Sequence, residues 1–341
     1  MKLITIALLI LFSVSAHSVT IDILSEYSCP VEMITSIPVR IDSCQLLESG
    51  GLRISASQSV LFNDVEFNYD SWTIVIDSDW CPMSCDRAAL DNSFELSTAQ
   101  LGGSGEMWLI ACAEQGDTLW TCALEGTDEF HVNPFVTEIS DGRYLVNNDP
   151  DCHSTCTEIQ SISAAGEMIC HYSLNTDYLL DLPEPIGETA AYVHSLRMTS
   201  SGDILIGGAV QQWFTSPVAG FVCLLDGDTG NPLWRNAGYF RGMASVYDAV
   251  ETSSGHVIAV GTTARSVELE ETPRTMWGTE LAFIAVLDAT GTLQKMVVCD
   301  LDIANCFYSI IETDQSECEF LIVGTGSSSY ELVFLKVIIS T

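Results

Sequence analysis

Residues 247–266 read YDAVETSSGHVIAVGTTARS, and after a longer loop residues 281–298 read LAFIAVLDATGTLQKMVV. In the first stretch, apolar residues alternate on both sides of Ser253, Ser254 and Gly255, which predicts a strand, a tight turn and a second strand. The second stretch repeats this pattern around a turn over residues 288–291. Together the two stretches predict four short strands within about fifty residues.

Units of the same kind recur along the chain. Their starting points lie near Gln45, Arg87, Val136, Ser195, Tyr247 and Ser309. One small sheet cannot bury both of its faces alone, so four-stranded units spaced roughly 40 to 60 residues apart are typical of a β-propeller, in which each sheet is one blade. A solenoid is the second interpretation, although solenoid repeats are shorter and more uniform. The sequence therefore predicts an all-β protein with about six four-stranded blades.

The two ends of the chain predict how the ring of blades closes. The unit that starts near Ser309 ends after its third strand, whereas residues 19–24 and 32–41 are β-type segments without a hairpin partner of their own. We expect the N-terminal segment to supply the missing strand, because closure removes sheet edges that would otherwise aggregate. The blade number becomes seven if residues 19–41 form more than one strand. Residues 19–341 are then a single propeller domain.

Residues 1–18 have the features of a secretory signal peptide. Lys2 supplies the positive charge, residues 3–14 form an apolar run, and small residues at 14–16 or 16–18 offer a cleavage site. The apolar run is too short for a comfortable membrane span. We expect an exported, soluble protein, located in the periplasm or outside the cell, that does not insert into a membrane.

The charge balance excludes some partners. The chain has 46 acidic residues against 12 basic ones, a net charge of −34. This excess repels phosphate backbones and anionic lipids, so we expect no nucleic-acid binding. It is compatible with a solubilising exterior, with a basic partner or with bound divalent cations.

The chain has 13 cysteines, all of them after the predicted signal peptide. In an oxidising compartment these predict disulfide bonds, and the odd number leaves at least one thiol unpaired. Sequence alone leaves the connectivity open, but several cysteines are close along the chain. The candidate disulfide cysteines are Cys29, Cys44, Cys81, Cys85, Cys112, Cys122, Cys152, Cys156, Cys299 and Cys306. A zinc site at residues 81–85 and 152–156 is the alternative for four of them.

Residues 225–234, LDGDTGNPLW, resemble the LD-x-x-TG-x-x-LW pattern of PQQ-like propeller repeats, and residues 287–291 keep part of it. The upstream sequences TSSGDILIGG and TSSGHVIAVG look like PQQ-like or WD40-like repeats of secreted bacterial propellers of unassigned role. The resemblance implies that Asp and Gly form the turn before the fourth strand and that Trp234 joins one blade to the next. Quinone-dependent dehydrogenases of this kind carry adjacent cysteines, which this chain lacks. The resemblance therefore implies the non-enzymatic type, which serves in assembly or binding.

The candidate ligand-contacting residues are Trp213, Phe214 and Trp277, in two loops at equivalent places of consecutive units. Aromatic side chains on one face could bind a protein or glycan, or they could pack over a neighbouring blade. The oxygen-rich loop at residues 147–151 could bind calcium, although solvated carboxylates in a turn explain it equally. No other cofactor is expected. We expect a monomeric binding or scaffold protein; the alternative is a hydrolase or quinone-dependent oxidoreductase with its site in the central funnel.

Overall fold

The fold is described from a computed structural model. It describes residues 20–30, 39–46, 52–62, 65–76, 82–87, 94–100, 107–113, 118–123, 135–138, 143–148, 156–175, 189–212, 217–236, 244–264, 280–299, 306–314, 318–325 and 331–340. These residues contain 23 β-strands and no helix. Within them, nothing resembles a membrane-spanning helix. The prediction of an all-β fold is confirmed.

The strands form antiparallel sheets that mostly follow chain order. The first sheet contains β2 (Val39–Leu46), β3 (Leu52–Phe62), β4 (Val65–Ile76) and β5 (Pro82–Arg87). The second contains β6 (Phe94–Gln100), β7 (Met107–Ala113) and β8 (Thr118–Ala123). The third contains β9 (Phe135–Glu138), β10 (Tyr144–Asn148), β11 (Cys156–Ile162) and β12 (Met168–Asn175).

The remaining sheets repeat the same order of strands. The fourth contains β13 (Thr189–Met198), β14 (Ile204–Gln212), β15 (Pro217–Leu225) and β16 (Pro232–Asn236). The fifth contains β17 (Ser245–Glu251), β18 (Val257–Ala264), β19 (Glu280–Leu287) and β20 (Leu293–Val298). The sixth joins β21 (Cys306–Asp314), β22 (Glu319–Thr325) and β23 (Glu331–Ser340) to β1 (Thr20–Pro30).

Strand β1 pairs with β23, so the two ends of the described chain share one sheet. The pairing is antiparallel and runs from Thr20 opposite Ser340 to Pro30 opposite Glu331. Ile21 of β1 packs against the hydrophobic cluster between the fifth and sixth sheets. The sixth sheet thus has its fourth strand from the N-terminal segment.

One predicted boundary is wrong. The unit expected to begin at Arg87 does not begin there, because Arg87 ends β5 and pairs with Trp72 of the first sheet. The second sheet, as far as the structure describes it, has three strands, and the predicted turn at residues 91–92 lies outside the described residues. Alternation of apolar residues could not separate the last strand of one sheet from the first strand of the next, because both continue the same pattern.

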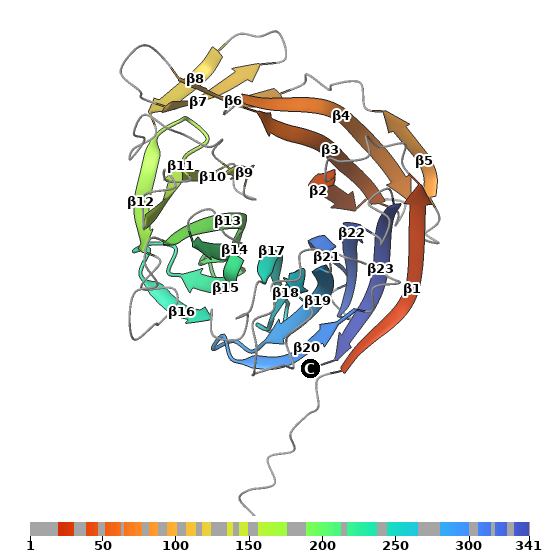
Figure 1. Ribbon diagram of the computed structural model, residues 1–341. Coiled ribbons are helices and arrows are strands. Elements are labelled where there is room, and N and C mark those ends of the chain that lie inside the picture. Colours follow the sequence, from red (N-terminus) through yellow and green to blue (C-terminus); the bar gives the residue numbers. More distant parts are fainter. Residues whose placement is uncertain are drawn as a thin grey trace, which may run out of the picture.

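The sheets follow one another around a common centre (Figure 1). The first strands β2, β9, β13, β17 and β21 lie toward this centre, whereas β5, β12, β16, β20 and β1 lie outside (Figure 1). The third to sixth sheets contact their neighbours in turn, and β21 of the sixth contacts β2 of the first. This is a β-propeller-like all-β fold.

The hydrophobic core lies between the faces of consecutive sheets. One cluster joins Leu145 and Tyr172 of the third sheet to Phe221 of the fourth. A second joins Val222 to Phe283 across the fourth and fifth sheets, and a third lies between the fifth and sixth. The fourth and fifth sheets thus bury both faces against their neighbours, which holds their inner and outer strands in place.

Outer aromatic side chains pack against turns of the next sheet. Trp234 of β16 lies against Gly291, where an added Cβ would come within 2.4 Å of the indole ring. Tyr172 of β12 lies against Gly230 in the same way, and its hydroxyl donates a hydrogen bond to the Gly227 carbonyl at 2.8 Å. Both glycines have positive φ. The role that the PQQ-like resemblance implied for Trp234 is therefore found in the structure.

Candidate ligand site on the inner strands

The inner strands carry β-bulges at equivalent positions. The register shifts between Val193 and Ser195 in β13, between Val246 and Asp248 in β17, and between Phe307 and Ser309 in β21. The residues skipped at these shifts are His194, Tyr247 and Tyr308. A bulge releases one residue from the pairing and re-aims its side chain, which is why bulges recur near functional sites.

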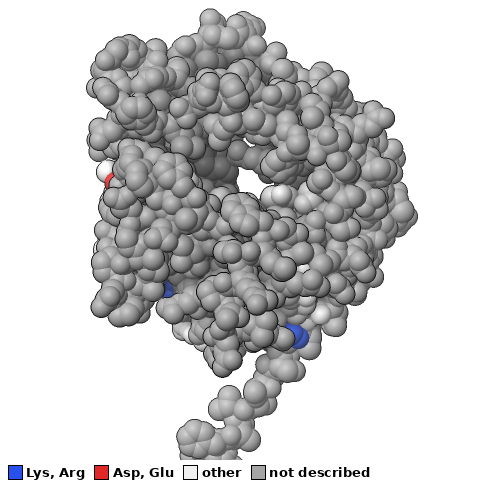
Figure 2. Space-filling model, in the orientation of Figure 1, with Lys and Arg blue, Asp and Glu red and all other residues white. Residues whose placement is uncertain are grey.

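These three residues form a continuous aromatic row across three sheets; we call them the inner aromatic row. The rings of His194 and Tyr247 are stacked, with centroids 4.8 Å apart and an interplanar angle of 28°. Tyr247 meets Tyr308 edge to face, with centroids 5.1 Å apart and an angle of 61°. All three side chains are partly exposed. The molecule is hollowed at the centre of the face seen in Figure 2.

The Tyr308 phenol remains protonated at ordinary pH. Burial, with a smaller contribution from the neighbouring Cys306, raises the pKa of Tyr308 far above its usual value. A neutral phenol can donate a hydrogen bond but does not act as a base near neutral pH. The row therefore offers ring faces and hydroxyl groups instead of a titrating carboxylate.

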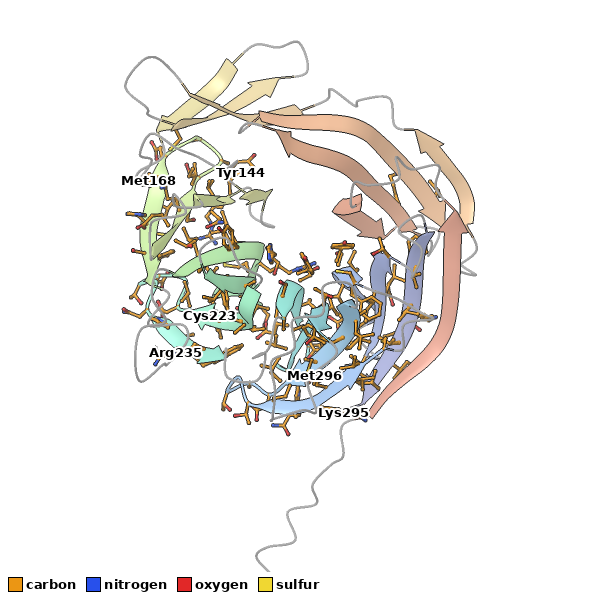
Figure 3. The ribbon with its side chains drawn as sticks, in the orientation of Figure 1. Tyr144, Met168, Cys223, Arg235, Lys295 and Met296 are labelled. Atoms are coloured by element: carbon orange, nitrogen blue, oxygen red, sulfur yellow. The ribbon has the colours of Figure 1, made fainter. Side chains whose placement is uncertain are left out.

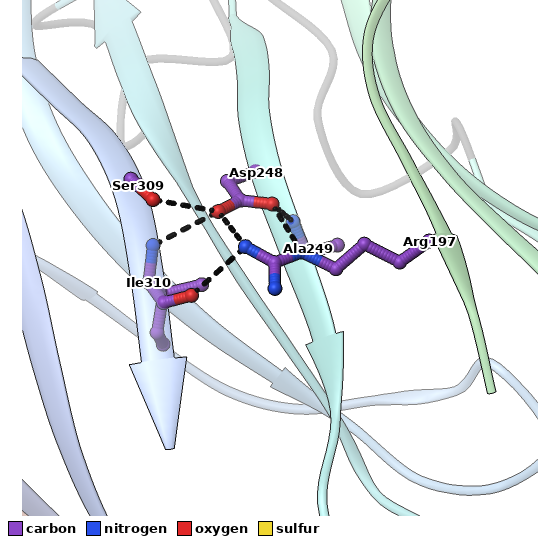
Figure 4. Close-up of polar contacts among 5 residues, drawn as sticks. All are labelled: Arg197, Asp248, Ala249, Ser309 and Ile310. Carbon is purple, nitrogen blue, oxygen red and sulfur yellow. Dashed lines mark hydrogen bonds and ion pairs between the residues drawn. The ribbon is translucent and has the colours of Figure 1, made fainter. Parts of the chain in front are cut away.

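A buried ion pair connects the strands that carry the row (Figure 4). Asp248, with its side chain 6% exposed, accepts hydrogen bonds from Nε (2.9 Å) and Nη2 (2.5 Å) of Arg197 on β13. The same carboxylate accepts from the Ser309 hydroxyl at 3.1 Å and from the backbone N–H of Ile310 at 3.0 Å, both on β21. The N–H of Ala249 completes its partners at 2.9 Å.

This ion pair positions the row. Asp248 directly follows Tyr247, and Ser309 directly follows Tyr308. Arg197 also donates from Nη2 to the Ile310 carbonyl at 3.1 Å, so one guanidinium contacts both neighbouring inner strands. A carboxylate with this many donors is fully compensated for its burial.

Two of the described basic side chains form ion pairs with acidic residues. Arg197 is paired with Asp248, and Lys336 of β23 is paired with Glu319 at 2.8 Å. Arg235 and Lys295 belong to the outer strands β16 and β20 and lie at the outer edge of the molecule (Figure 3). Of these side chains, Arg197 is therefore occupied by Asp248, and Arg235 and Lys295 lie away from the inner strands.

One serine–histidine contact has the geometry of a turn instead of a catalytic pair. The Ser254 hydroxyl lies 3.1 Å from His256 Nδ1 in an exposed hairpin. In the preceding sheet the equivalent Ser201 hydroxyl donates to Asp203 at 2.6 Å, and each serine also contacts the threonine two residues earlier. Because His256 replaces an aspartate in the same turn, its role there is to stabilise the turn.

The predicted ligand-contacting residues Trp213, Phe214 and Trp277 lie outside the described residues. Their role remains a prediction. The inner aromatic row was missed because a bulge changes the register by one residue, which a hydrophobic pattern alone does not reveal. An available signal was the recurrence of His or Tyr followed by Ser or Asp in HSL, YDA and YSI, one triplet at the start of each of three units.

The predicted disulfides are not demonstrated. Cys112 lies opposite Thr118 and Cys122 opposite Leu109, so this register does not place these two cysteines face to face. Cys29, Cys44, Cys85 and Cys156 lie in strands β1, β2, β5 and β11. Cys299 and Cys306 are buried near the fifth and sixth sheets, and Cys81 and Cys152 lie outside the described residues. The thiols of Cys170, Cys223 and Cys318 are free.

The metal hypotheses also remain predictions. Asn147 is described and buried, at 2% exposure, but residues 149–151 of the same loop lie outside the described residues. Within the described ranges, no three His, Cys, Asp or Glu side chains gather in a way that would hold a metal ion.

Comparisons with known proteins support the fold and leave the activity open. No family model matches the chain, and no curated protein matches it significantly. A solved protein of unknown function from Dyadobacter fermentans is similar over 94% of this chain and 99% of its own, with a TM-score of 0.51 and 10% identity. A member of the DUF4221 family from Bacteroides vulgatus is similar over 95% and 99% of the two chains, with a TM-score of 0.50 and 11% identity.

A third similar structure is the WD40 domain of Neurospora crassa Pan2, which aligns over 93% of this chain and 95% of its own with a TM-score of 0.43 and 9% identity. At these identities the similarity concerns the fold alone.

Proposed function

We propose that this chain is a secreted β-propeller that acts as a binding or scaffold protein, and that its ligand contacts the inner aromatic row. On this proposal the six sheets are six blades, and β1 closes the ring by pairing with β23. The pairing of β1 with β23 and the contact of β21 with β2 support closure. The N-terminal sequence supports export.

The observation that carries the binding proposal is the inner aromatic row itself. Three aromatic residues at bulges of consecutive inner strands contact one another across sheet boundaries, and each keeps part of its surface accessible. A core aromatic residue would be fully enclosed by its own inter-sheet cluster, as Phe283 is. Preorganised aromatic side chains with a few polar atoms are typical of ligand sites.

The binding proposal is tested with a ligand panel applied to the wild type and to Tyr247→Ala. The panel contains neutral oligosaccharides, basic peptides and acidic peptides, and binding is measured by isothermal titration calorimetry. We expect at least one class to bind the wild type and to lose about tenfold or more in affinity with Tyr247→Ala, because aromatic contacts dominate such sites. A ligand that binds both proteins equally would place the binding surface elsewhere and overturn the proposal.

A matched control separates binding from folding. Tyr172→Phe changes a tyrosine of the outer strand β12, where the hydroxyl contacts the Gly227 carbonyl. This variant should retain ligand affinity even though its stability falls. Turnover of any panel member by the wild type would instead favour the enzyme alternative.

A further inference from the structure

The chemical class of the ligand follows from the charges around the row, and this inference rests on the binding function proposed above. We propose that the inner aromatic row binds a basic polypeptide segment through its guanidinium or ammonium groups.

The ring faces are suited to cations. Tyrosine rings carry negative potential on their faces and attract Arg and Lys side chains within about 6 Å of the ring centre. Tyr247 and Tyr308 meet edge to face, so their ring planes point in different directions at one place. His194 covers one face of Tyr247, and the edge-to-face contact uses a further ring face. A guanidinium group would stack on a face that these contacts leave, while its N–H groups reach a phenol oxygen.

The charge of the molecule favours the same class. The net charge of −34 raises the local concentration of cations and repels anions. The Arg197 guanidinium is neutralised, because Asp248 accepts hydrogen bonds from its Nε and Nη2 at 2.9 Å or less. An anionic ligand would therefore find the Arg197 guanidinium already paired with a carboxylate.

The series of bulges continues into the first sheet, at a position that is occupied by an acidic residue. The register of β2 shifts between Ile41 and Ser43, which places Asp42 at the bulge position equivalent to those of Tyr247 and Tyr308. Strand β2 contacts β21, the strand that carries Tyr308. The order of bulge residues along the inner strands is thus His194, Tyr247, Tyr308 and Asp42.

The length of the row fits a short peptide. The ring centroids are spaced at 4.8 and 5.1 Å. About three residues of an extended chain, at roughly 3.3 Å each, span the same distance. Because side chains of an extended segment alternate between two faces, every second residue, about 7 Å apart, faces the row. Two basic side chains of such a segment could therefore contact the row together, whereas a single small cation would contact only one or two rings.

The test measures binding of defined probes to the wild type. The probes are hexa-arginine, hexa-lysine, spermine, hexa-glutamate and cellohexaose, titrated by calorimetry at about 50 mM and about 500 mM salt, which shorten the Debye length from roughly 14 to 4 Å. We expect hexa-arginine and hexa-lysine to bind, with affinity falling at high salt, and hexa-glutamate not to bind. Tighter binding of spermine than of hexa-lysine would overturn the choice of a polypeptide.

Variants separate ring-face recognition from general attraction. Tyr247→Leu should weaken hexa-arginine binding about tenfold, and Tyr247→Phe should change it less than about threefold, because phenylalanine keeps the ring face. Asp42→Asn should weaken binding several-fold, whereas Asp228→Asn, at an exposed turn of the fourth sheet, should leave it unchanged. Thermal unfolding of each variant identifies any that fails to fold. If the Tyr247 variants fail to fold, the comparison of Asp42→Asn with Asp228→Asn tests the proposal.

The outcomes distinguish the two proposals. If cellohexaose binds and Tyr247→Leu abolishes that binding, the row is a ligand site but the cation inference is wrong. If hexa-arginine binds the Leu, Phe and Asn variants as tightly as the wild type, the peptide adsorbs to general negative charge and the cation inference is wrong. If none of the probes binds in a way that depends on the row, both proposals fail.

Discussion

Asp248 lies where three inner strands meet, and its surroundings explain why such a buried charge is retained. Its carboxylate receives donors from Arg197, Ala249, Ser309 and Ile310. A buried ion pair adds little net stability when both partners are present, but removal of one partner leaves the other uncompensated. At this scale the pair fixes the spacing of β13, β17 and β21 and thereby the geometry of the inner aromatic row.

Replacing Asp248 by Asn should destabilise the protein. We expect Asp248→Asn to lower the free energy of unfolding by about 2–3 kcal/mol, below the usual range for fully buried pairs because the Arg197 side chain is 36% exposed. Urea denaturation measures this change. The matched control Asp228→Asn, at an exposed position, should stay within about 0.5 kcal/mol of the wild type. Equal stability of the two variants would mean that the ion pair does not connect the sheets.

A second prediction at the residue scale concerns acid stability. Hydrogen bonds from the side chain and backbone of Thr229 lower the pKa of the exposed Asp226. At Asp288, partial desolvation alone would raise the pKa of the carboxyl group. Hydrogen bonds from Thr290, Thr292 and Gln294 outweigh this effect, so the pKa of Asp288 lies below 3.8. A carboxyl group with a lowered pKa in the folded state stabilises the fold above its unfolded pKa, and this contribution is lost as the pH falls through the folded pKa.

Asp288→Asn should therefore reduce the dependence of stability on pH in the acid range. Stability of the wild type should fall as the pH drops below about 4, and the variant should show a shallower fall because it has one fewer shifted carboxyl group. Urea denaturation at a series of pH values measures both slopes. Identical slopes would show that the hydrogen bonds to Asp288 do not persist in solution.

At the element scale, glycines in the second strand of three sheets permit close approach to the first strand. A Cβ at Gly208, Gly261 or Gly324 would lie 2.2, 1.9 or 2.1 Å from the carbonyl oxygen of Tyr192, Ser245 or Cys306, respectively. These close approaches lie just before the bulges that present the row, because Tyr192 and Ser245 are each two residues ahead of a skipped residue, as is Cys306. Glycine in a strand interior often marks such a site.

Gly261→Ala should disturb this element strongly. The added methyl group would collide with backbone, which cannot move as a flexible side chain can, so we expect a loss of about 3 kcal/mol. The control Gly255→Asn lies at a turn with φ of 80°, a conformation that Asn tolerates, and it should cost about 1 kcal/mol or less. The difference is measured by thermal and urea unfolding. A mild effect of Gly261→Ala would show that β17 and β18 are further apart.

Hairpins were predictable from the sequence at this scale, whereas the candidate site was not. The turns at Gly255 and Gly291 were marked by Gly next to Ser, Asp or Thr between alternating apolar residues, and both glycines have the positive φ that such turns require. The row depends on one-residue bulges and on contacts between residues about fifty to sixty positions apart. Neither is encoded in local periodicity, and the loops with Trp213, Phe214 and Trp277 lie outside the described residues.

For the whole molecule, the pairing of β1 with β23 joins the two ends of the chain. Without β1, strand β23 would be an edge strand with exposed N–H and C=O groups, which promote association with other chains. Predicting this pairing required only that the last unit lacks a strand and that the N-terminal segment lacks a partner. The boundary between the first two sheets was harder, because Arg87, which the sequence suggested as the start of a unit, is the last residue of β5.

A chain that begins at residue 39 should therefore be less stable and self-associating. Compared with a chain that begins at residue 19, we expect oligomers in size-exclusion chromatography with light scattering and a lower unfolding midpoint. Adding a synthetic peptide of residues 19–30 should restore the monomer, because it can pair with β23. A truncated protein that stays monomeric and equally stable would show that β1 does not protect the edge of β23.

The central claim, that the inner aromatic row contacts the ligand, is tested most directly by NMR of a protein with isotope-labelled tyrosine rings. The chain has 10 tyrosines, and the Tyr247 signal is assigned by its absence in Tyr247→Phe. On titration with hexa-arginine and, separately, with cellohexaose, we expect the Tyr247 and Tyr308 signals to move with one of the probes while the signal of Tyr172, on an outer strand, stays in place. Movement of the Tyr172 signal alone, or of no tyrosine signal while a probe binds, would contradict the account.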